Sequence, residues 1–300
     1  MSTIENPNTA FFPEEEKNKI LPSTLYLVAT PIGNLADISE RAVKTLREVD
    51  FIAAEDTRNS GKLLRILGIE KPLVSYFEHN KAEKGPQIAD RLEAGESCAL
   101  ITDAGTPAIS DPGEDLVALC AQNGVDVISI PGPCALVTAL SVSGLPTVRF
   151  VFEGFLPTNK KNRRQRLDRL AEEERTVILY EAPHKLRDTL EDLRATFGGE
   201  RRISLCRELT KLHEQVLRTT LAEACDHYAE NEPKGEFVLV VDGAPVFEEE
   251  TVTPETALQR MDFLRQQGLS TKAAAKQAAE ELGLPKNKLY DLALGKISQW

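Results

Sequence analysis

Two loops rich in glycine and proline carry the residues of this sequence whose types suit small-molecule binding. They are TPIGN at Thr30 to Asn34 and DAGTPAISDPG at Asp103 to Gly113. Each follows a short apolar run, and ligands of α/β sheets bind at the carboxyl ends of strands. Glycines permit close backbone approach and prolines stiffen a loop. The loops therefore predict one shared binding site, although a pair of tight turns fits the same residues.

Neither loop has the spacing of a phosphate-binding motif. The sequence contains no G-x-G-x-x-G and no G-x-x-x-x-G-K-[ST], so a nucleotide-phosphate cradle is not supported. The histidines stand far apart, without an H-x-x-x-H pair or neighbouring cysteines. We therefore expect chemistry that uses no metal. The histidines are His79, His184, His213 and His227.

A basic stretch interrupts an acidic chain. The net charge of −11 disfavours a protein that coats nucleic acid. Residues 159–169, NKKNRRQRLDR, nevertheless hold six basic side chains against one acid. The stretch predicts a local phosphate contact; a solvated helix face balanced by the acids at 172–174 is the alternative. Four more cations could extend the basic surface: Arg201, Arg202, Arg207 and Lys211.

Three further polar clusters follow apolar runs, where loops often carry function. They are AEDTRNS at 54–60, SYFEHN at 75–80 and YEAPHK at 180–185. Each is equally compatible with a helix cap, for which Asp56 or Thr57 is an example. The clusters therefore add candidate residues but do not by themselves indicate a particular reaction.

Apolar runs alternate with helix-like stretches along most of the chain. A strand at 25–29 leads through the first loop to a helix at 39–48 and a strand at 51–55. The pattern recurs later and restarts after Pro146. Such alternation predicts α/β structure. We expect two α/β domains, at 24–135 and 136–243.

The flanking segments differ in composition from this α/β part. Residues 1–23 are polar without a signal-peptide pattern, and no apolar run approaches the roughly 20 residues that cross a bilayer. Residues 244–254 predict a linker. Residues 255–300 predict a helical module, either helix-turn-helix-like or a plain three-helix cap. Five cysteines without a C-x-x-C pair indicate a reducing compartment, so we expect a cytoplasmic protein with no membrane segment.

Six segments, taken in order, resemble a known family. They are LVATPIGNLADIS, AEDTRNSGKLL, ALITDAGTPAISDPG, IPGPCA, GFLP and ILYEAPHKL. From about Leu25 to Gly243 the chain resembles the ribosomal RNA small-subunit methyltransferase I family. The resemblance implies the tetrapyrrole methylase fold, with S-adenosylmethionine held in a cleft between two α/β domains, and usually a homodimer. It implies 2′-O-methylation of a cytidine in the decoding region of 16S ribosomal RNA, either free or in the small ribosomal subunit.

The resemblance also assigns residues to the cofactor. They come from both loops, the PGP turn and the second domain: Thr30, Pro31, Gly33, Asp103, Gly105, Thr106, Ile109, Cys134, Ala135, Tyr180, Glu181 and Ala182. The tetrapyrrole branch usually has G-G-D-P where this chain has Ala104 to Pro107, and this departure favours RNA as the substrate.

A ribose hydroxyl is a weak nucleophile, so methyl transfer to it calls for a proton acceptor. Glu181 or His184 is the candidate, and Arg207 would steady the adjacent phosphate. Further contacts with the RNA are expected from Asp56, Arg58, His79, Asn80, Lys160, Lys161, Arg163, Arg164, Arg166 and Lys211.

Two other functions remain open at this point. A methyltransferase of the same fold could act on a tetrapyrrole or a modified protein residue, which the basic stretch disfavours. A non-catalytic RNA- or DNA-binding regulator could use the C-terminal helices, which the acidic net charge disfavours.

Overall fold

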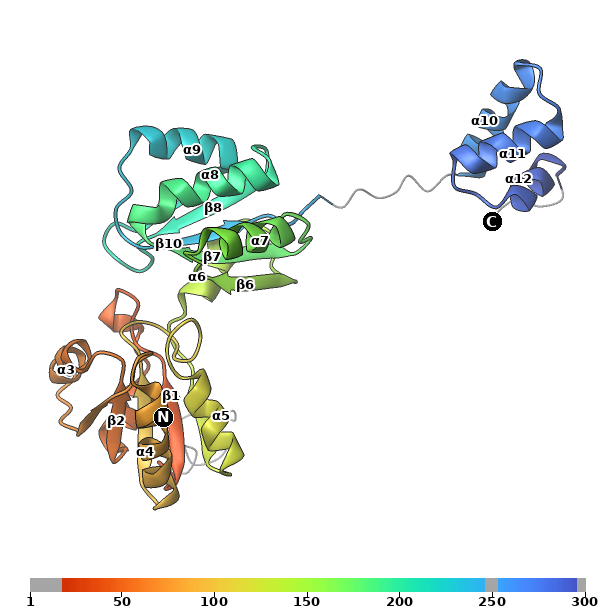
Figure 1. Ribbon diagram of the computed structural model, residues 1–300. Coiled ribbons are helices and arrows are strands. Elements are labelled where there is room, and N and C mark those ends of the chain that lie inside the picture. Colours follow the sequence, from red (N-terminus) through yellow and green to blue (C-terminus); the bar gives the residue numbers. More distant parts are fainter. Residues whose placement is uncertain (1–17, 246–252, 296–300) are drawn as a thin grey trace, which may run out of the picture. The chain divides into compact units, whose positions relative to one another are not determined.

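The computed structural model describes residues 18–245 and 253–295 (Figure 1). The chain divides into two compact units, Met1–Ala244 and Pro245–Trp300. Residues 1–17 of the predicted leader, 246–252 of the predicted linker and 296–300 of the predicted module lie outside the described residues.

The first sheet has five parallel strands in the order β3-β2-β4-β1-β5. Its strands are β1 Thr24–Val28, β2 Phe51–Ala54, β3 Leu73–Ser75, β4 Ser97–Ile101 and β5 Asp126–Ile130. Strands β2 and β4 are short apolar runs buried at every position, as is usual where helices cover both faces of a sheet. Because all five strands run the same way, the loops that leave them gather at one edge.

Helices cover both faces of this sheet (Figure 1). The elements are η1 Leu35–Asp37, α2 Glu40–Glu48, α3 Thr57–Ile66, α4 Lys81–Glu93 and α5 Glu114–Gln122. Helices α2 and α3 pack on one face through Leu46 and Leu64. Helices α4 and α5 pack on the other through Leu92 and Leu116. The sheet is therefore held rigid from both sides.

The second sheet has the order β6-β7-β10-β8-β9. Strands β6 and β7 pair in parallel and the other neighbours are antiparallel. Its elements are β6 Phe150–Gly154, β7 Thr176–Glu181, β8 Arg202–Arg207, β9 Gln215–Thr220 and β10 Phe237–Val241, with α6 Ala135–Val142, α7 Lys160–Ala171, η2 Pro183–Lys185, α8 Leu186–Phe197 and α9 Leu221–Glu230.

The side chains of β7 divide between the two faces of this sheet. Val177 and Leu179 belong to the core shared with α7, α8 and α9. Ile178 and Tyr180 belong to the core shared with α6. Successive residues of a strand point to opposite faces. Glu181 consequently faces the layer of α7 and α8.

Three helices form the C-terminal unit: α10 Pro254–Gln266, α11 Thr271–Glu281 and α12 Lys286–Ala293. Met261, Leu264, Ala278 and Leu289 contribute to its own hydrophobic core. Ser270 caps α11, with its hydroxyl accepting from the Ala273 amide. The predicted helical module is thus present. No helix in residues 18–245 or 253–295 is long and apolar enough to cross a membrane.

Because the C-terminal helices have a core of their own, removing residues 245–300 should leave the α/β unit folded. We expect the truncated chain to unfold cooperatively with an unchanged thermal midpoint for its α/β signal, followed by circular dichroism. A midpoint several degrees lower, about 1 kcal/mol or more of lost stability, would show that the helices stabilise the α/β unit.

Candidate functional site

The loops after β1 and β4 are joined by a pair of backbone hydrogen bonds. The Thr30 amide donates to the Gly105 carbonyl over 2.9 Å, and the Gly105 amide donates to the Thr30 carbonyl over 3.0 Å. The Thr30 hydroxyl also donates to the Thr102 carbonyl. Gly105 has φ = +85°, a conformation that favours glycine. The two glycine- and proline-rich loops therefore form one connected structure.

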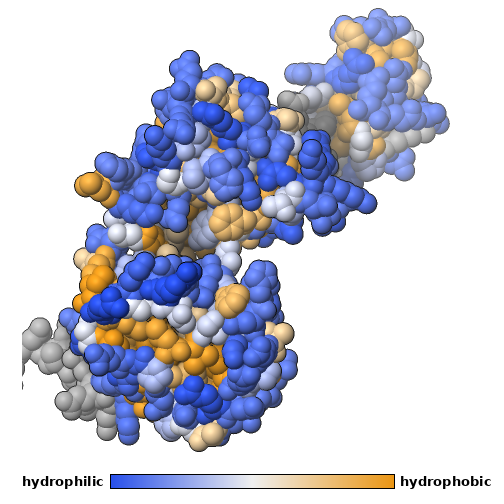
Figure 2. Space-filling model, turned by 60° about the vertical axis from the view of Figure 1, so that its left-hand side comes forward, coloured by the Kyte–Doolittle hydropathy of each residue, from blue (hydrophilic) through white to orange (hydrophobic). Residues whose placement is uncertain are grey.

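A cavity of about 490 Å³ lies next to these loops, with residues of both α/β domains in its walls. This volume is within the range of roughly 300–1,000 Å³ found for small-molecule sites. The space-filling view shows the hollow between the two domains, with hydrophobic residues in its walls (Figure 2). The cavity is therefore the candidate functional site.

Nine of the twelve residues predicted for the cofactor line this cavity: Asp103, Gly105, Thr106, Ile109, Cys134, Ala135, Tyr180, Glu181 and Ala182. Thr30, Pro31 and Gly33 are not among its lining residues, and their loop contributes Ile32 instead. The role of Thr30 in the structure is to hold the second loop through the backbone bridge.

Three carboxylates of the first domain line the cavity: Glu55, Asp103 and Asp111. Burial raises the pKa of Asp111 to about 6, and the charges of Glu55 and Asp103 add to the effect. Burial also raises the pKa of Glu55. Asp103 accepts a hydrogen bond from the Asn59 side-chain amide over 3.0 Å. In the described part of the chain no lysine or arginine forms an ion pair with these carboxylates, so the site suits a cationic ligand.

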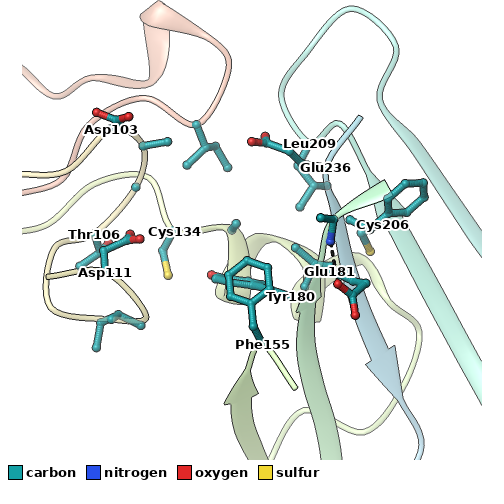
Figure 3. A pocket seen from close by; sticks show the side chains of 18 of the residues that line it. Asp103, Thr106, Asp111, Cys134, Phe155, Tyr180, Glu181, Cys206, Leu209 and Glu236 are labelled. Atoms are coloured by element: carbon teal, nitrogen blue, oxygen red, sulfur yellow. Dashed lines mark hydrogen bonds between the residues drawn. The ribbon is translucent and has the colours of Figure 1, made fainter. Parts of the chain in front are cut away.

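Aromatic side chains form part of the opposite wall (Figure 3). The Tyr180 ring packs edge-on against Phe152 and Phe155, with centroids 4.9 and 5.8 Å away. Its hydroxyl accepts from the Leu136 amide over 3.1 Å, and burial raises its pKa to about 12. The first-domain wall thus offers three carboxylates, and the second-domain wall offers an aromatic surface together with Glu236, whose carboxylate pairs with Lys211.

The two predicted proton acceptors lie in different surroundings. The Glu181 side chain is 4% exposed and its carboxylate accepts from the Ala182 amide and the Thr189 hydroxyl. In Figure 3 its carboxylate lies apart from the labelled side chains that face the cavity. His184 is exposed and follows Pro183, a residue of the cavity wall. Glu181 is thus buried and hydrogen-bonded, whereas His184 is open to solvent next to a residue of the cavity wall.

Most arginines of the basic stretch have acidic partners. Arg163 pairs with Asp192, Arg164 with Asp168 and Arg166 with Glu153. Lys160 and Lys161, at the start of α7, are exposed, and no hydrogen bond or ion pair of their side chains is found among the described residues. The basic stretch therefore presents these two lysines openly, together with Arg169 near the end of α7, which is likewise exposed and has no partner among the described residues.

The remaining RNA candidates mainly serve local structure. Asp56 pairs with Arg58 and caps α3, which keeps the pKa of the Asp56 carboxyl low, at about 2. Asn80 accepts from the Phe77 amide over 2.8 Å, whereas His79 is exposed. The Lys211 amine donates to the Glu208 and Glu236 carboxylates, and Arg207 donates to the Lys234 carbonyl.

Sequence reasoning missed three of the cavity acids, Glu55, Asp111 and Glu236. The first two stand in segments that it had singled out. Glu55 precedes Asp56 at the end of β2, and Asp111 lies in the second loop. Their position after a strand was the available signal. Among the described residues, no group of three or more His, Cys, Asp or Glu side chains could hold a metal ion.

Comparison with known proteins assigns the chain to a family. The family model for Tetrapyrrole (Corrin/Porphyrin) Methylases matches residues 24–225, and that for the RsmI C-terminal HTH domain matches residues 253–297. A ribosomal RNA small subunit methyltransferase I of Synechocystis is 52% identical over 90% of this chain and 97% of its own length. One of Pseudomonas aeruginosa is 50% identical over 90% of this chain and 96% of its own length.

The chain belongs to the ribosomal RNA small subunit methyltransferase I family. The predicted family and the predicted methyltransferase activity are thereby confirmed.

Solved structures confirm the fold of this methyltransferase family member. Diphthine synthase gives a TM-score of 0.56 at 15% identity, covering 73% of this chain and 90% of that one. Cobalt precorrin-4 methyltransferase gives 0.54 at 18% identity, covering 73% and 94%. A uroporphyrin-III C-methyltransferase from Thermus thermophilus, complexed with S-adenosylhomocysteine, gives 0.51 at 17% identity, covering 72% and 96%. The expected α/β fold of the tetrapyrrole methylase type is therefore correct.

Gly33 lets the first loop approach the loop after β8. A Cβ atom at Gly33 would lie 2.4 Å from the Lys211 Cγ and 3.2 Å from the Leu209 carbonyl oxygen. We expect Gly33→Ala to lower the free energy of unfolding by about 1–3 kcal/mol, because one of the loops must shift. Urea denaturation measures the change.

The control for this substitution is Gly61→Ala in α3, where the nearest atom to the added Cβ is 3.9 Å away. That substitution should be neutral or stabilising by up to about 1 kcal/mol, since alanine favours a helix. Equal stability of Gly33→Ala and wild type would contradict a tight contact between the two loops.

Proposed function

We propose that this methyltransferase transfers a methyl group from S-adenosylmethionine to the 2′-hydroxyl of a cytidine ribose in the decoding region of 16S ribosomal RNA. The observation that carries the proposal is the cavity between the two α/β domains, lined by three carboxylates of the first domain and by aromatic side chains of the second, in a member of this family. The substrate is the ribosomal RNA, either free or within the small ribosomal subunit.

The cavity residues fit S-adenosylmethionine. This molecule combines a cationic sulfonium and ammonium with a flat adenine, and when bound it supplies an activated methyl group. The carboxylates of Glu55, Asp103 and Asp111 suit the cationic end. The apolar side chains of Phe155 and Tyr180 offer a surface for the adenosine end.

Positioning supplies most of the catalysis that the protein residues provide. A methyl transfer is an in-line displacement, so the walls must hold donor and acceptor in one geometry and keep water out. We assign the acceptance or orientation of the ribose proton to His184, because it is exposed beside the wall residue Pro183. We assign phosphate contact first to Lys160 and Lys161, which are openly presented at the start of α7.

The assignment of substrate is tested by transfer of labelled methyl from S-adenosylmethionine to small subunits purified from cells that lack this protein. Nuclease digestion should place the label in a 2′-O-methylcytidine of the 16S RNA. Binding of the donor without transfer to RNA, together with transfer to a tetrapyrrole or a protein residue, would replace the RNA proposal.

We also propose a homodimer that works in the cytoplasm, where ribosomal substrates are present. Large hydrophobic side chains at the surface support self-association; Val148 is 93% exposed. Figure 2 shows further hydrophobic residues gathered on the surface of the first domain. Sedimentation equilibrium should give twice the chain mass of 33.1 kDa, and a single chain mass at micromolar concentration would refute the dimer.

The raised pKa of Asp111, about 6, predicts pH-dependent donor binding. Below this pKa the carboxyl is protonated and loses its attraction for a cation, whereas above it the ionised form binds the cation. We expect S-adenosylmethionine to bind about tenfold more weakly at pH 5 than at pH 7. Isothermal titration calorimetry measures the profile.

Asp111→Asn should flatten this pH profile and weaken binding at pH 7 by about tenfold. Glu55 contributes to the residual dependence, because its pKa is raised as well. Asp126→Asn, an exposed position of β5 outside the cavity wall, is the control and should behave as wild type. A wild-type affinity that does not change between pH 5 and pH 7 would contradict the role of the acids.

His184→Ala should lower kcat by about 10²-fold while leaving donor affinity unchanged, because general acid–base groups typically contribute at this level. Single-turnover transfer to small subunits measures the rate. His227→Ala is the matched control, since His227 is exposed on α9 and does not line the cavity. Unchanged kcat in His184→Ala would remove His184 from the mechanism.

A further inference from the structure

A chain of hydrogen bonds connects helix α7 with the wall of the cavity. The Arg163 Nε donates to the Asp192 carboxylate over 2.7 Å, and its Nη2 donates to the Thr189 hydroxyl over 2.8 Å. That hydroxyl donates to the Glu181 Oε2 over 2.5 Å. The Glu181 Oε1 accepts from the Ala182 amide over 2.9 Å. Each carboxylate oxygen of Glu181 therefore has a fixed donor.

The centre of this chain is buried. Thr189 is 0% exposed, Glu181 is 4% exposed and the Arg163 side chain is 16% exposed. A buried carboxylate is costly unless its oxygens are hydrogen-bonded. The Thr189 hydroxyl meets this need because it can accept from Arg163 while it donates to Glu181. The Thr189 hydroxyl therefore links the Arg163 guanidinium to the Glu181 carboxylate through two hydrogen bonds.

The chain ends at the segment that forms the second-domain wall of the cavity. Tyr180, Ala182 and Pro183 all line the cavity. On one face of β7 the Tyr180 hydroxyl accepts from the Leu136 amide of α6. On the other face Glu181 is held by Thr189 of α8. The wall segment 180–183 is thus anchored from both sides of the sheet.

We propose that Arg163 and Thr189 are positioning residues for donor binding, because they hold the Glu181 carboxylate and through it the wall segment 180–183. The inference rests on the proposed function, since it takes S-adenosylmethionine as the ligand of the cavity. It gives Glu181 and Arg163 roles different from those expected from the sequence. Glu181 anchors the wall rather than accepting a proton, and Arg163 supports it rather than contacting RNA.

Thr189→Val is the direct test, because valine keeps the shape of threonine and removes the hydroxyl. We expect the Kd of S-adenosylmethionine, measured by isothermal titration calorimetry, to rise about tenfold. Thr189→Ser should restore wild-type affinity. At saturating donor the single-turnover rate of methyl transfer should stay within about threefold of wild type, since the reacting groups are intact.

Arg163→Gln is a second test, because it leaves Thr189 and Glu181 unchanged. It replaces the first test if circular dichroism shows that Thr189→Val does not fold. Arg163→Gln should also raise the Kd about tenfold. Arg164→Gln is the matched control, because the neighbouring Arg164 is exposed and pairs with Asp168 on the same helix. It should bind the donor as wild type does.

Glu181→Gln separates anchoring from proton transfer. A glutamine can still accept from the Ala182 amide, but its NH2 group cannot accept from the Thr189 hydroxyl as the carboxylate does, so the Kd of the donor should rise about tenfold, as in Thr189→Val. A large loss of rate at saturating donor with unchanged Kd would show instead that Glu181 accepts the proton. That result, or wild-type Kd values in folded Thr189→Val and Arg163→Gln, would overturn the inference. Failure of the wild-type protein to bind the donor would instead overturn the proposed function.

Discussion

The backbone bridge between Thr30 and Gly105 is the constraint on which the candidate site depends. Two hydrogen bonds of 2.9 and 3.0 Å tie together the loops that leave neighbouring strands β1 and β4. The second loop carries Asp103 and Asp111 into the cavity wall. A loop without this tie would have to order its backbone on ligand binding, at a cost of about 1–2 kcal/mol for each residue fixed. The bridge pre-arranges the acids instead.

In the second domain a strand, rather than a pair of loops, holds the cavity wall in place. Alternation along β7 sends Tyr180 to the cavity side and Glu181 to the helical layer. The two neighbouring residues therefore anchor one wall segment to α6 and to α8. Glu181, a polar group that the sequence suggested for proton transfer, is hydrogen-bonded within the wall, and His184, which follows the wall residue Pro183, is exposed to solvent.

Much of this arrangement was predictable from the sequence. The alternating apolar runs indicated two α/β domains, and the glycine- and proline-rich loops indicated the carboxyl edge of the first sheet. Nine of the twelve predicted cofactor residues, taken from both domains, line the cavity. The partners of long side chains were not predictable. In the sequence Arg163 is one of six cations in its stretch. Its hydrogen-bond partners Asp192 and Thr189 are distant in sequence and lie next to it only in the folded chain. Glu55 was not predicted as a site residue, because in the sequence it stands in the same polar cluster as Asp56 and Arg58, and only the structure shows that these two pair with each other.

The most direct test of this account is to locate the bound donor on the chain. Ultraviolet cross-linking of labelled S-adenosylmethionine, followed by peptide mapping, should place the label on peptides that contain residues 103–111 and 180–183. An excess of unlabelled donor should abolish it. Label confined to the groove between α7 and α8, which is lined by residues such as Lys160 and Lys185, or to the C-terminal helices would contradict the assignment of the cavity as the donor site.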